Sequence, residues 1–419
     1  MAAEGETAHL ARRVSHAAST IDGTRPFWTL QRNNLLAQIQ SSDCRSPNVF
    51  FTVSAADVQW PDLHRLMPGY DPDLDNPAHA DSYRRHLKWL NENPALASYY
   101  FQKHWELFFE LVLKKKFNII DWWWCFEWQY RGSSHIHGFF WFADAPKVDE
   151  LDFNNQEHIQ QFIQYWDQII STWHPDRHRP PAAIHPSAQL FPSLQDTITE
   201  LAEMLNRFQR HDRCTPGYCE RRRDGQKVCR FGFPFPDCNE SHIQRLPGKT
   251  FPEYVPRRND ALLNTFNPLF ILGWRANIDI RPVTNQESVV SYIAKYASKS
   301  EDKSQSYKDL LHSAISKLND GDPAHAAYQK MLSSFVAEHD ISGQEVCHVL
   351  LGCDLVSSSR YYRSLYVGFN THQELNFETG ELGVDQNSGI IKHYLKWPTT
   401  VEFEQMTLLD FAKRAQVQN

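Results

Sequence analysis

Two histidines separated by one residue, His135 and His137, are the first candidates for chemistry in this sequence. Residues two apart on a β-strand point to the same face, so both imidazoles could bind one cation. Glu127 and Gln129 are also two apart, on the other side of a turn-like segment, and either could supply an oxygen ligand. Two imidazoles and one oxygen leave positions open on a divalent cation for a substrate oxygen. Since twenty histidines give about one His-x-His pair by chance, the apolar context of this pair is what favours a metal site.

A second candidate site lies on a predicted helix over residues 289–299. At about 100° per residue, its aliphatic side chains fall on one side, and two tyrosines and two lysines cluster on the other. These four residues are Tyr292, Lys295, Tyr296 and Lys299. A phenol has an ordinary pKa near 10, so a nearby cation or metal would help it act as a nucleophile. Phenolate, ammonium groups and a divalent metal together suit a phosphodiester as the substrate.

Four of the eight cysteines fall within residues 211–242, a short and basic segment. Soft ligands gathered in such a segment are what a structural tetrahedral zinc requires, and the alternative is a solvated loop with incidental cysteines. Basic residues also outnumber acidic ones between Arg207 and Arg230, so this segment could bind phosphates. The zinc candidates are His211, Cys214, Cys219 and Cys229, spaced H-x2-C-x4-C-x9-C, with Cys238 and His242 as alternatives.

The elements that must position these residues are a mixture of strands and helices. The histidine pair falls on a predicted hairpin, residues 119–130 and 136–142, which we expect at the centre of a sheet. A helix is expected to begin at Asn93, as a cap residue, followed by Pro94. The other predicted strands cover residues 48–54, 277–282 and 361–369, and the other predicted helices cover residues 27–39, 156–173, 197–210 and 286–299.

Composition restricts the class of protein. The chain has 419 residues, of which 41% are hydrophobic and 22% charged, which excludes collagen-like, low-complexity and largely disordered proteins. A formal net charge of −7 argues against coating nucleic acid by bulk charge, so any such role must be local. No apolar run reaches the roughly 20 residues needed to cross a bilayer, and no secretory signal is recognisable. We therefore expect a soluble, intracellular protein without a membrane partner.

Taken in order, several motifs resemble the replication-initiator domain of Helitron rolling-circle transposases, across about residues 26–370. That domain belongs to the two-tyrosine branch of the His-hydrophobic-His (HUH) endonucleases. The matching motifs are Ser54-Ala-Ala-Asp57 with Trp60-Pro61, Glu127-x-Gln129-x-Arg131-Gly132-x-x-His135-Ile-His137, the Cys-rich segment, Arg275-Ala-Asn277-Ile-Asp279-Ile and Tyr292-Ile-Ala-Lys-Tyr296-Ala-Ser-Lys299.

The resemblance implies an α+β fold with a central antiparallel β-sheet and flanking helices. A zinc-binding element over about residues 205–245 would be inserted in an HUH endonuclease domain spanning residues 48–300. An N-terminal lead-in and helix would occupy residues 1–47. Residues 301–419 would form a mixed helical region to which no role is assigned.

The resemblance also implies roles for residues. His135 and His137 would bind Mg²⁺ or Mn²⁺, with Glu127 or Gln129 as third ligand. Tyr292 and Tyr296 would be the nucleophiles of a single-strand DNA nickase and strand-transferase that forms a 5′-phosphotyrosine intermediate. The two helix lysines, Lys295 and Lys299, would neutralise phosphate charge or assist the phenol.

Partners and rival functions follow from the same resemblance. The substrate would be single-stranded DNA, such as a transposon end, and the location nuclear. Helitron proteins continue into a helicase, and none is present up to Asn419, so a helicase is expected to act in trans. The main alternative is a domesticated transposase fragment that binds DNA with the help of zinc but does not cut. An RNA-binding module is a third possibility, although no RNA-binding motif is recognisable.

Overall fold

The computed structural model divides into two compact units, one of residues 19–300 and 340–360, the other of residues 1–18, 301–339 and 361–419. In the second unit, strands β10 (His372–Leu375) and β11 (Leu382–Asp385) pair antiparallel. The residues that the structure describes are 19–41, 43–73, 75–79, 81–128, 132–189, 196–216, 219–223, 225–245, 252–286, 289, 342–362, 372–375, 382–385, 394–395, 406–408 and 410–411.

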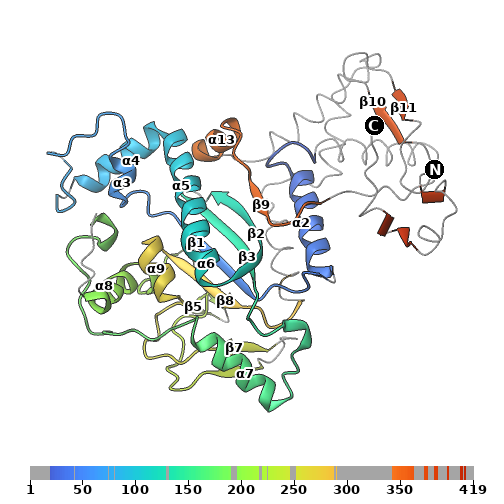
Figure 1. Cartoon of the computed structure of the whole chain (residues 1–419). Helices are drawn as coiled ribbons and strands as arrows, with labels where there is room; N and C mark the ends of the chain where they lie inside the picture. The colour runs from blue at the N-terminus through green and yellow to red at the C-terminus, as the bar shows by residue number, and fades with distance from the viewer. Residues whose placement is uncertain are drawn as a thin grey trace. The chain divides into compact units, whose positions relative to one another are not determined.

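The first unit is built around an antiparallel sheet with the strand order β8-β1-β3-β2-β9 (Figure 1). The predicted hairpin is β2 and β3, and β3 is the middle strand of the five described. The predictions of an α+β fold and of a central hairpin are therefore confirmed. The strands are β1 (Val49–Ser54), β2 (Ile119–Trp128), β3 (Ser134–Phe142), β8 (Ile278–Pro282) and β9 (Val356–Ser358).

Alternation along β3 divides its side chains between two hydrophobic cores. Ile136 and Phe140 belong to the larger core, whereas Phe139 and Trp141 belong to a second core on the opposite face. By the same alternation, His135 and His137 share the face of the second core.

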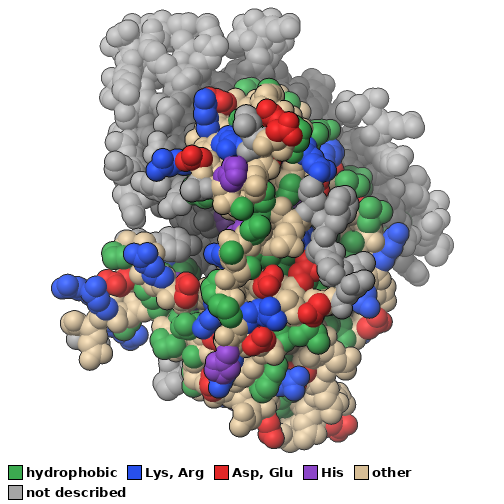
Figure 2. All heavy atoms as spheres, turned by 90° about the vertical axis from the view of Figure 1, so that its left-hand side faces the viewer, with side chains coloured by type: hydrophobic (Ala, Val, Ile, Leu, Met, Phe, Trp, Pro, Cys, Tyr) green, Lys and Arg blue, Asp and Glu red, His purple; other side chains and the backbone are tan. Residues whose placement is uncertain are grey.

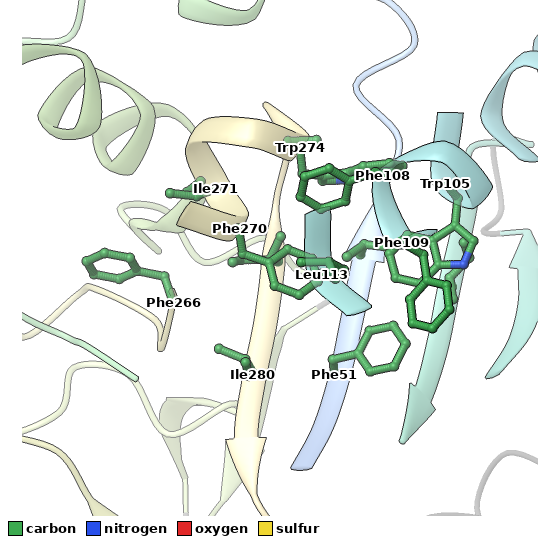
Figure 3. Packing of buried hydrophobic residues seen from close by; sticks show 14 of the residues in the cluster. Phe51, Trp105, Phe108, Phe109, Leu113, Phe266, Phe270, Ile271, Trp274 and Ile280 are labelled. Carbon is green, nitrogen blue, oxygen red and sulfur yellow. The ribbon is translucent and has the colours of Figure 1, made fainter. Parts of the chain in front are cut away.

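A long helical segment covers the face of the larger core. Helix α5 (Pro94–Phe108) continues through a π-helical turn, Phe109–Leu113, into α6 (Lys114–Lys116). Trp105 stacks on Phe51 of β1, with ring centroids 5.4 Å apart. Both side chains are labelled in Figure 3. Helix α9 (Pro268–Trp274) packs beside α5, its Trp274 ring 5.7 Å from that of Phe108.

Helix α2 (Arg25–Gln40) lies on the other face, as expected for residues 27–39. Its Leu35 and Ile39 are buried in the second core with Trp123, Phe139 and Val289. The face that carries the histidine pair is thus closed in part by α2 (Figure 1).

The short strand β9 closes the β2 edge of the sheet, although more than two hundred residues separate the two strands. Just beyond β9, Arg360 donates two hydrogen bonds of 2.7 Å to the buried carboxylate of Asp121 in β2. Burial alone would raise the pKa of Asp121, but Arg360 and the Ser359 hydroxyl lower it overall. The end of the sheet is therefore fixed by an ion pair as well as by strand pairing.

The remaining elements surround this framework. They are α3 (Pro61–His64), α4 (Ser82–Glu92), α7 (Gln156–Asp167), α8 (Thr197–Met204) with a π-helical turn Leu205–Gln209, α13 (Gly343–Leu350), the 3-10 turns Val148–Glu150 and Pro186–Ala188, and the hairpins β4 (Glu220–Arg223) with β5 (Gln226–Cys229) and β6 (His242–Gln244) with β7 (Glu253–Val255).

Two predicted details were wrong. The helix expected over residues 156–173 ends at Asp167, because Ser171 and Thr172 form β-bridges with Phe266 and Arg258. Asn93 precedes α5 but does not cap it, since its side chain donates instead to the carbonyl oxygen of Trp89, at 2.9 Å.

Other expectations lie outside the described residues. Of the helix predicted over residues 286–299 the structure describes only residues 286 and 289, and of the strand predicted over residues 361–369 only residues 361 and 362. Within the described part of the chain, no helix combines the length and apolar character that crossing a membrane requires.

Candidate metal centres

The histidine pair lies where three strands meet at one end of the sheet. His135 is paired with Ser54 of β1 on one side and with Glu127 of β2 on the other. Both imidazoles are nearly buried, with 9% of His135 and 7% of His137 exposed. Their rings are near parallel, with centroids 6.4 Å apart, so the two residues do share one face as predicted.

Glu127 joins the pair from the neighbouring strand. Its carboxylate oxygen Oε2 lies 2.6 Å from Nε2 of His137. Of the two oxygen ligands predicted from the sequence, Glu127 is thus in contact with a candidate histidine, and Gln129 lies outside the described residues. A carboxylate beside two imidazoles is a donor set that a divalent cation can use.

Ser54 orients the other ring. Its hydroxyl oxygen Oγ lies 3.0 Å from Nδ1 of His135. That contact occupies Nδ1 and leaves Nε2 as the nitrogen that could bind a cation. Metal-binding histidines are commonly held in this way through their second ring nitrogen.

Gly138 directly follows His137, and its lack of a side chain allows β3 to pack closely against β1 and β2. A Cβ atom at this position would lie 2.5 Å from the carbonyl oxygen of Trp123, 2.6 Å from Cβ of Trp124 and 2.8 Å from Cε1 of Phe51. Contacts this short exclude any side chain, so the strand beneath the two histidines is held against its neighbours.

The four residues of the predicted tyrosine helix, Tyr292, Lys295, Tyr296 and Lys299, lie outside the described residues. Val289, three residues before Tyr292, is described and only 1% exposed. It packs in the second core with Trp123 and Phe139, on the sheet face that carries the histidine pair.

The predicted zinc residues do form a cluster. One ligand atom each from His211, Cys214, Cys219 and Cys229 lies within 4.8 Å of the others. Nε2 of His211 is 3.2 Å from Sγ of Cys214 and 3.4 Å from Sγ of Cys229. Such a set can hold a tetrahedral metal ion.

The two alternatives from the same segment stand apart from this cluster. Sγ of Cys238 lies 3.5 Å from Nδ1 of His242, and neither residue belongs to the group of four. Cys238 is held elsewhere because its backbone forms a β-bridge with Arg258.

The thiols of the cluster differ in acidity. Burial opposes ionisation of Cys229, but hydrogen bonds from the backbone amides of Phe231, Phe233 and Gly232 lower its pKa overall. Loss of solvation and the neighbouring thiols of Cys229 and Cys219 raise the pKa of Cys214 to about 11. Cys229 therefore ionises more readily than Cys214, and the thiolate is the form of cysteine that binds a metal.

A basic hairpin extends from the cluster. Arg221, Arg222 and Arg223 of β4 are exposed, and β5 returns to end at Cys229. Elsewhere, on the face shown in Figure 2, basic and acidic side chains are interspersed. The arginines of β4 thus form a local basic surface. Since the net charge of the chain is negative, nucleic acid could bind only to such a local surface.

A third group of candidate ligands was not predicted from the sequence. His64, Asp75 and His86 each offer one ligand atom within 4.8 Å of the others. They come from α3, from the segment after it and from α4, without a short motif spacing. The only sequence signal is that two histidines occupy the buried side of short helices.

The fold and its sites define an α+β domain whose central hairpin carries a histidine pair beside a carboxylate. Residues 1–140 match the family described as the Helitron helicase-like domain at the N-terminus. The match covers β1, β2, Glu127 and both histidines of β3. Over the first third of the chain, this match confirms the resemblance to a Helitron-related domain that the motifs predicted. No curated protein matches the chain.

Proposed function

We propose that this protein nicks single-stranded DNA and transfers the cut strand through a 5′-phosphotyrosine intermediate, as in rolling-circle transposition or replication initiation. The observation that supports this most is the group formed by Ser54, Glu127, His135 and His137 on three neighbouring strands of a Helitron-related domain.

The group fits a divalent cation. His135 and His137 would each supply a ring nitrogen and Glu127 a carboxylate oxygen, with Gln129 the alternative for the third position. Mixed nitrogen and oxygen ligands suit Mn²⁺, and Mg²⁺ is the other candidate. A cation held by these residues would supply polarisation of a phosphate oxygen.

A tyrosine would carry out the transfer itself. The phenol oxygen of Tyr292 or Tyr296 attacks phosphorus in line, the bond from phosphorus to the 3′ oxygen breaks, and the phenol proton ends on that oxygen as a free 3′-OH. The phosphodiester energy is kept in the protein–DNA bond, so rejoining requires no nucleotide. Lys295 and Lys299 would stabilise the charge on the phosphate.

The partner would be transposon-end DNA in single-stranded form, in the nucleus. The His211 and cysteine cluster would hold a structural Zn²⁺ and present the arginines of β4 to the phosphates of the bound strand.

A second candidate function is a DNA-binding protein that does not cut. The exposed arginines Arg221, Arg222 and Arg223, next to the His211 and cysteine cluster, favour it because they would bind a strand without catalysis. Such binding would weaken steeply with salt.

The test uses a labelled single-stranded oligonucleotide incubated with the full chain and Mn²⁺. We expect a covalent protein–DNA adduct that EDTA abolishes. His135→Ala should form no adduct while keeping the circular dichroism of the wild type. DNA binding without any adduct, with Mn²⁺ or Mg²⁺ present, would establish the second candidate instead.

The nucleophile is tested by substitution to phenylalanine, which removes only the phenol oxygen. The double variant Tyr292→Phe, Tyr296→Phe should form no adduct. The matched control is Tyr362→Phe with Tyr366→Phe, which has the same spacing and should form adduct normally. An adduct formed by the first double variant would contradict the mechanism.

The two tyrosines should not be equivalent, because one turn of helix places them roughly 6 Å apart along its axis. One single substitution should abolish the first nick and the other should mainly impair strand transfer. We expect Tyr292 to act first, and mass spectrometry of the adduct peptide identifies it.

A further inference from the structure

His64 and His86 are buried on the α3 and α4 side of the domain. Only 1% of His64 and 5% of His86 is exposed, and their rings stack with centroids 3.6 Å apart. Asp75 reaches them from the segment between the two helices, and its side chain is 8% exposed. Two imidazoles and a carboxylate are rarely gathered in so little solvent unless something compensates their charge and polarity.

Hydrogen bonds fix which ring nitrogens face one another. Nε2 of His64 lies 2.8 Å from the carbonyl oxygen of Asp57, and Nδ1 of His86 lies 2.9 Å from that of Val58. A carbonyl oxygen only accepts, so both nitrogens carry protons and donate. The lone pairs of the neutral rings are therefore on Nδ1 of His64 and Nε2 of His86.

Nε2 of His86 lies 2.6 Å from Oδ1 of Asp75. In a neutral ring this nitrogen is an acceptor, as is the carboxylate, so a positive charge must lie between them. Either a proton or a metal ion can supply it. A proton shared between His86 and Asp75 uses only two of the three groups, whereas a metal ion uses all three, whose ligand atoms lie within 4.8 Å of one another.

We propose that His64, Asp75 and His86 form a second transition-metal site, selective for Zn²⁺ or a similar dication. The ligands are Nδ1 of His64, Nε2 of His86 and a carboxylate oxygen of Asp75, with water in the fourth position. Bonds of about 2.1 Å in a tetrahedron place neighbouring ligand atoms roughly 3.4 Å apart, so Nε2 of His86 and Oδ1 of Asp75, now 2.6 Å apart, have to separate by less than about 1 Å on binding.

The surroundings match those of known metal histidines. In such sites the second ring nitrogen almost always donates to a backbone carbonyl, a carboxylate or water, which fixes the ring and its tautomer. Both rings here donate to carbonyls, and the two carbonyls are adjacent, on Asp57 and Val58. These residues lie three and four positions after the last residue of β1, so a metal ion would connect the chain leaving β1 to α3 and α4.

A metal ion at this site would have a structural role, because it would connect the chain after β1 to α3 and α4. Ser54, which orients His135, ends β1 three residues before Asp57. A metal ion held by His64 and His86 would therefore fix the backbone that leads away from the candidate catalytic face. The inference itself concerns metal binding alone and does not depend on cleavage.

The test is the metal content of the full chain, purified without chelator and measured by mass spectrometry of the elements. We expect about two Zn²⁺ ions for each wild-type chain, counted apart from any Mn²⁺ or Mg²⁺ held by the His135 and His137 group. Asp75→Asn and His86→Gln should each retain about one, and the matched control His79→Ala, an exposed histidine near Asp75, should retain about two. An unchanged content in Asp75→Asn with wild-type circular dichroism would overturn the proposal in favour of a proton-bridged pair.

A second measurement does not require those variants to fold. The double variant Cys214→Ser, His135→Ala removes one ligand from the cysteine cluster and one from the His135 and His137 group, and leaves the site of His64, Asp75 and His86 intact. Titrated with Co²⁺ after removal of metal, this variant should develop visible d–d absorption that saturates near one equivalent, without the thiolate charge-transfer band of a cysteine site. The absence of d–d absorption would also overturn the proposal.

Discussion

At the scale of single residues, Ser54 determines which nitrogen of His135 is available to a cation. Its hydroxyl contacts Nδ1 at 3.0 Å, so Ser54→Ala should let the ring rotate and weaken metal binding. Loss of such an orienting partner typically lowers metal affinity 10–100-fold. We expect a rise of that size, roughly tenfold or more, in the dissociation constant for Mn²⁺ measured by electron paramagnetic resonance. Ser357→Ala, on β9, is the control, and equal constants for the two variants would refute the orienting role.

His104 makes stability depend on pH. It is enclosed by Trp60 and Trp274, with ring centroids 4.9 Å and 4.8 Å away, and burial lowers its pKa to about 4. In the unfolded chain this histidine has an ordinary pKa near 6.5. Between pH 6.5 and pH 4 the unfolded chain therefore binds a proton at His104 that the folded chain does not bind. Stability is therefore full above pH 6.5 and falls as the pH drops toward 4.

The variant His104→Phe should lose this pH dependence. Between pH 7.5 and pH 4.5, its free energy of unfolding in urea should fall by roughly 2–3 kcal/mol less than that of the wild type. His79→Phe changes an exposed histidine and should follow the wild-type curve. A His104→Phe curve that also follows the wild type would show that His104 is protonated in the folded state.

At the scale of elements, Gly138 decides how closely β3 packs against its neighbours β2 and β1. Gly138→Ala would place a Cβ 2.5 Å from a backbone carbonyl oxygen, which cannot move without disturbing the strand pairing. Overpacking of this kind costs about 1–3 kcal/mol, and we expect the upper part of that range in urea unfolding.

Gly343→Ala in α13 is the control for that substitution. Its Cβ would lie 3.8 Å from the Pro94 side chain, an ordinary contact, so helix propensity should make it neutral or more stable by up to about 1 kcal/mol. Equal destabilisation by both alanines would contradict the packing argument.

The elements that sequence could predict are those with a local signal. The hairpin of β2 and β3 has two dense apolar runs around a glycine turn, and its register then brings Glu127 to the histidine pair. Strand β9 has no such signal, because Val-Ser-Ser becomes a strand only through its pairing with β2. The π-helical turns after α5 and α8 also lack a local signature.

The candidate metal ligands likewise divide into those with a local sequence signal and those that only the tertiary structure brings together. His211 and the three cysteines are close in sequence, so their grouping was predictable, and the structure separates them from Cys238 and His242. His64, Asp75 and His86 meet only because α3 and α4 pack together. A pattern that exists only in three dimensions cannot be found by spacing along the chain.

At the scale of the whole molecule, the cysteine cluster should stabilise the fold through its metal. A structural zinc contributes its binding free energy to folding, so Cys214→Ser should lose about one metal ion and unfold at a lower temperature. Cys347→Ser in α13 should change neither quantity. Wild-type metal content in Cys214→Ser, measured beside its thermal unfolding, would show that these cysteines do not bind metal.

The pairing of β9 with β2 also sets an order of events during synthesis. A ribosome delivers β1, β2, β3 and β8 long before residues 356–360, so the sheet edge from Trp123 to Cys125 emerges ahead of the strand that covers it. Over that interval of translation the nascent chain presents backbone hydrogen-bonding groups that can recruit strands of other chains. Chaperones that shield sheet edges should therefore associate with this protein mainly between the emergence of β2 and that of Arg360.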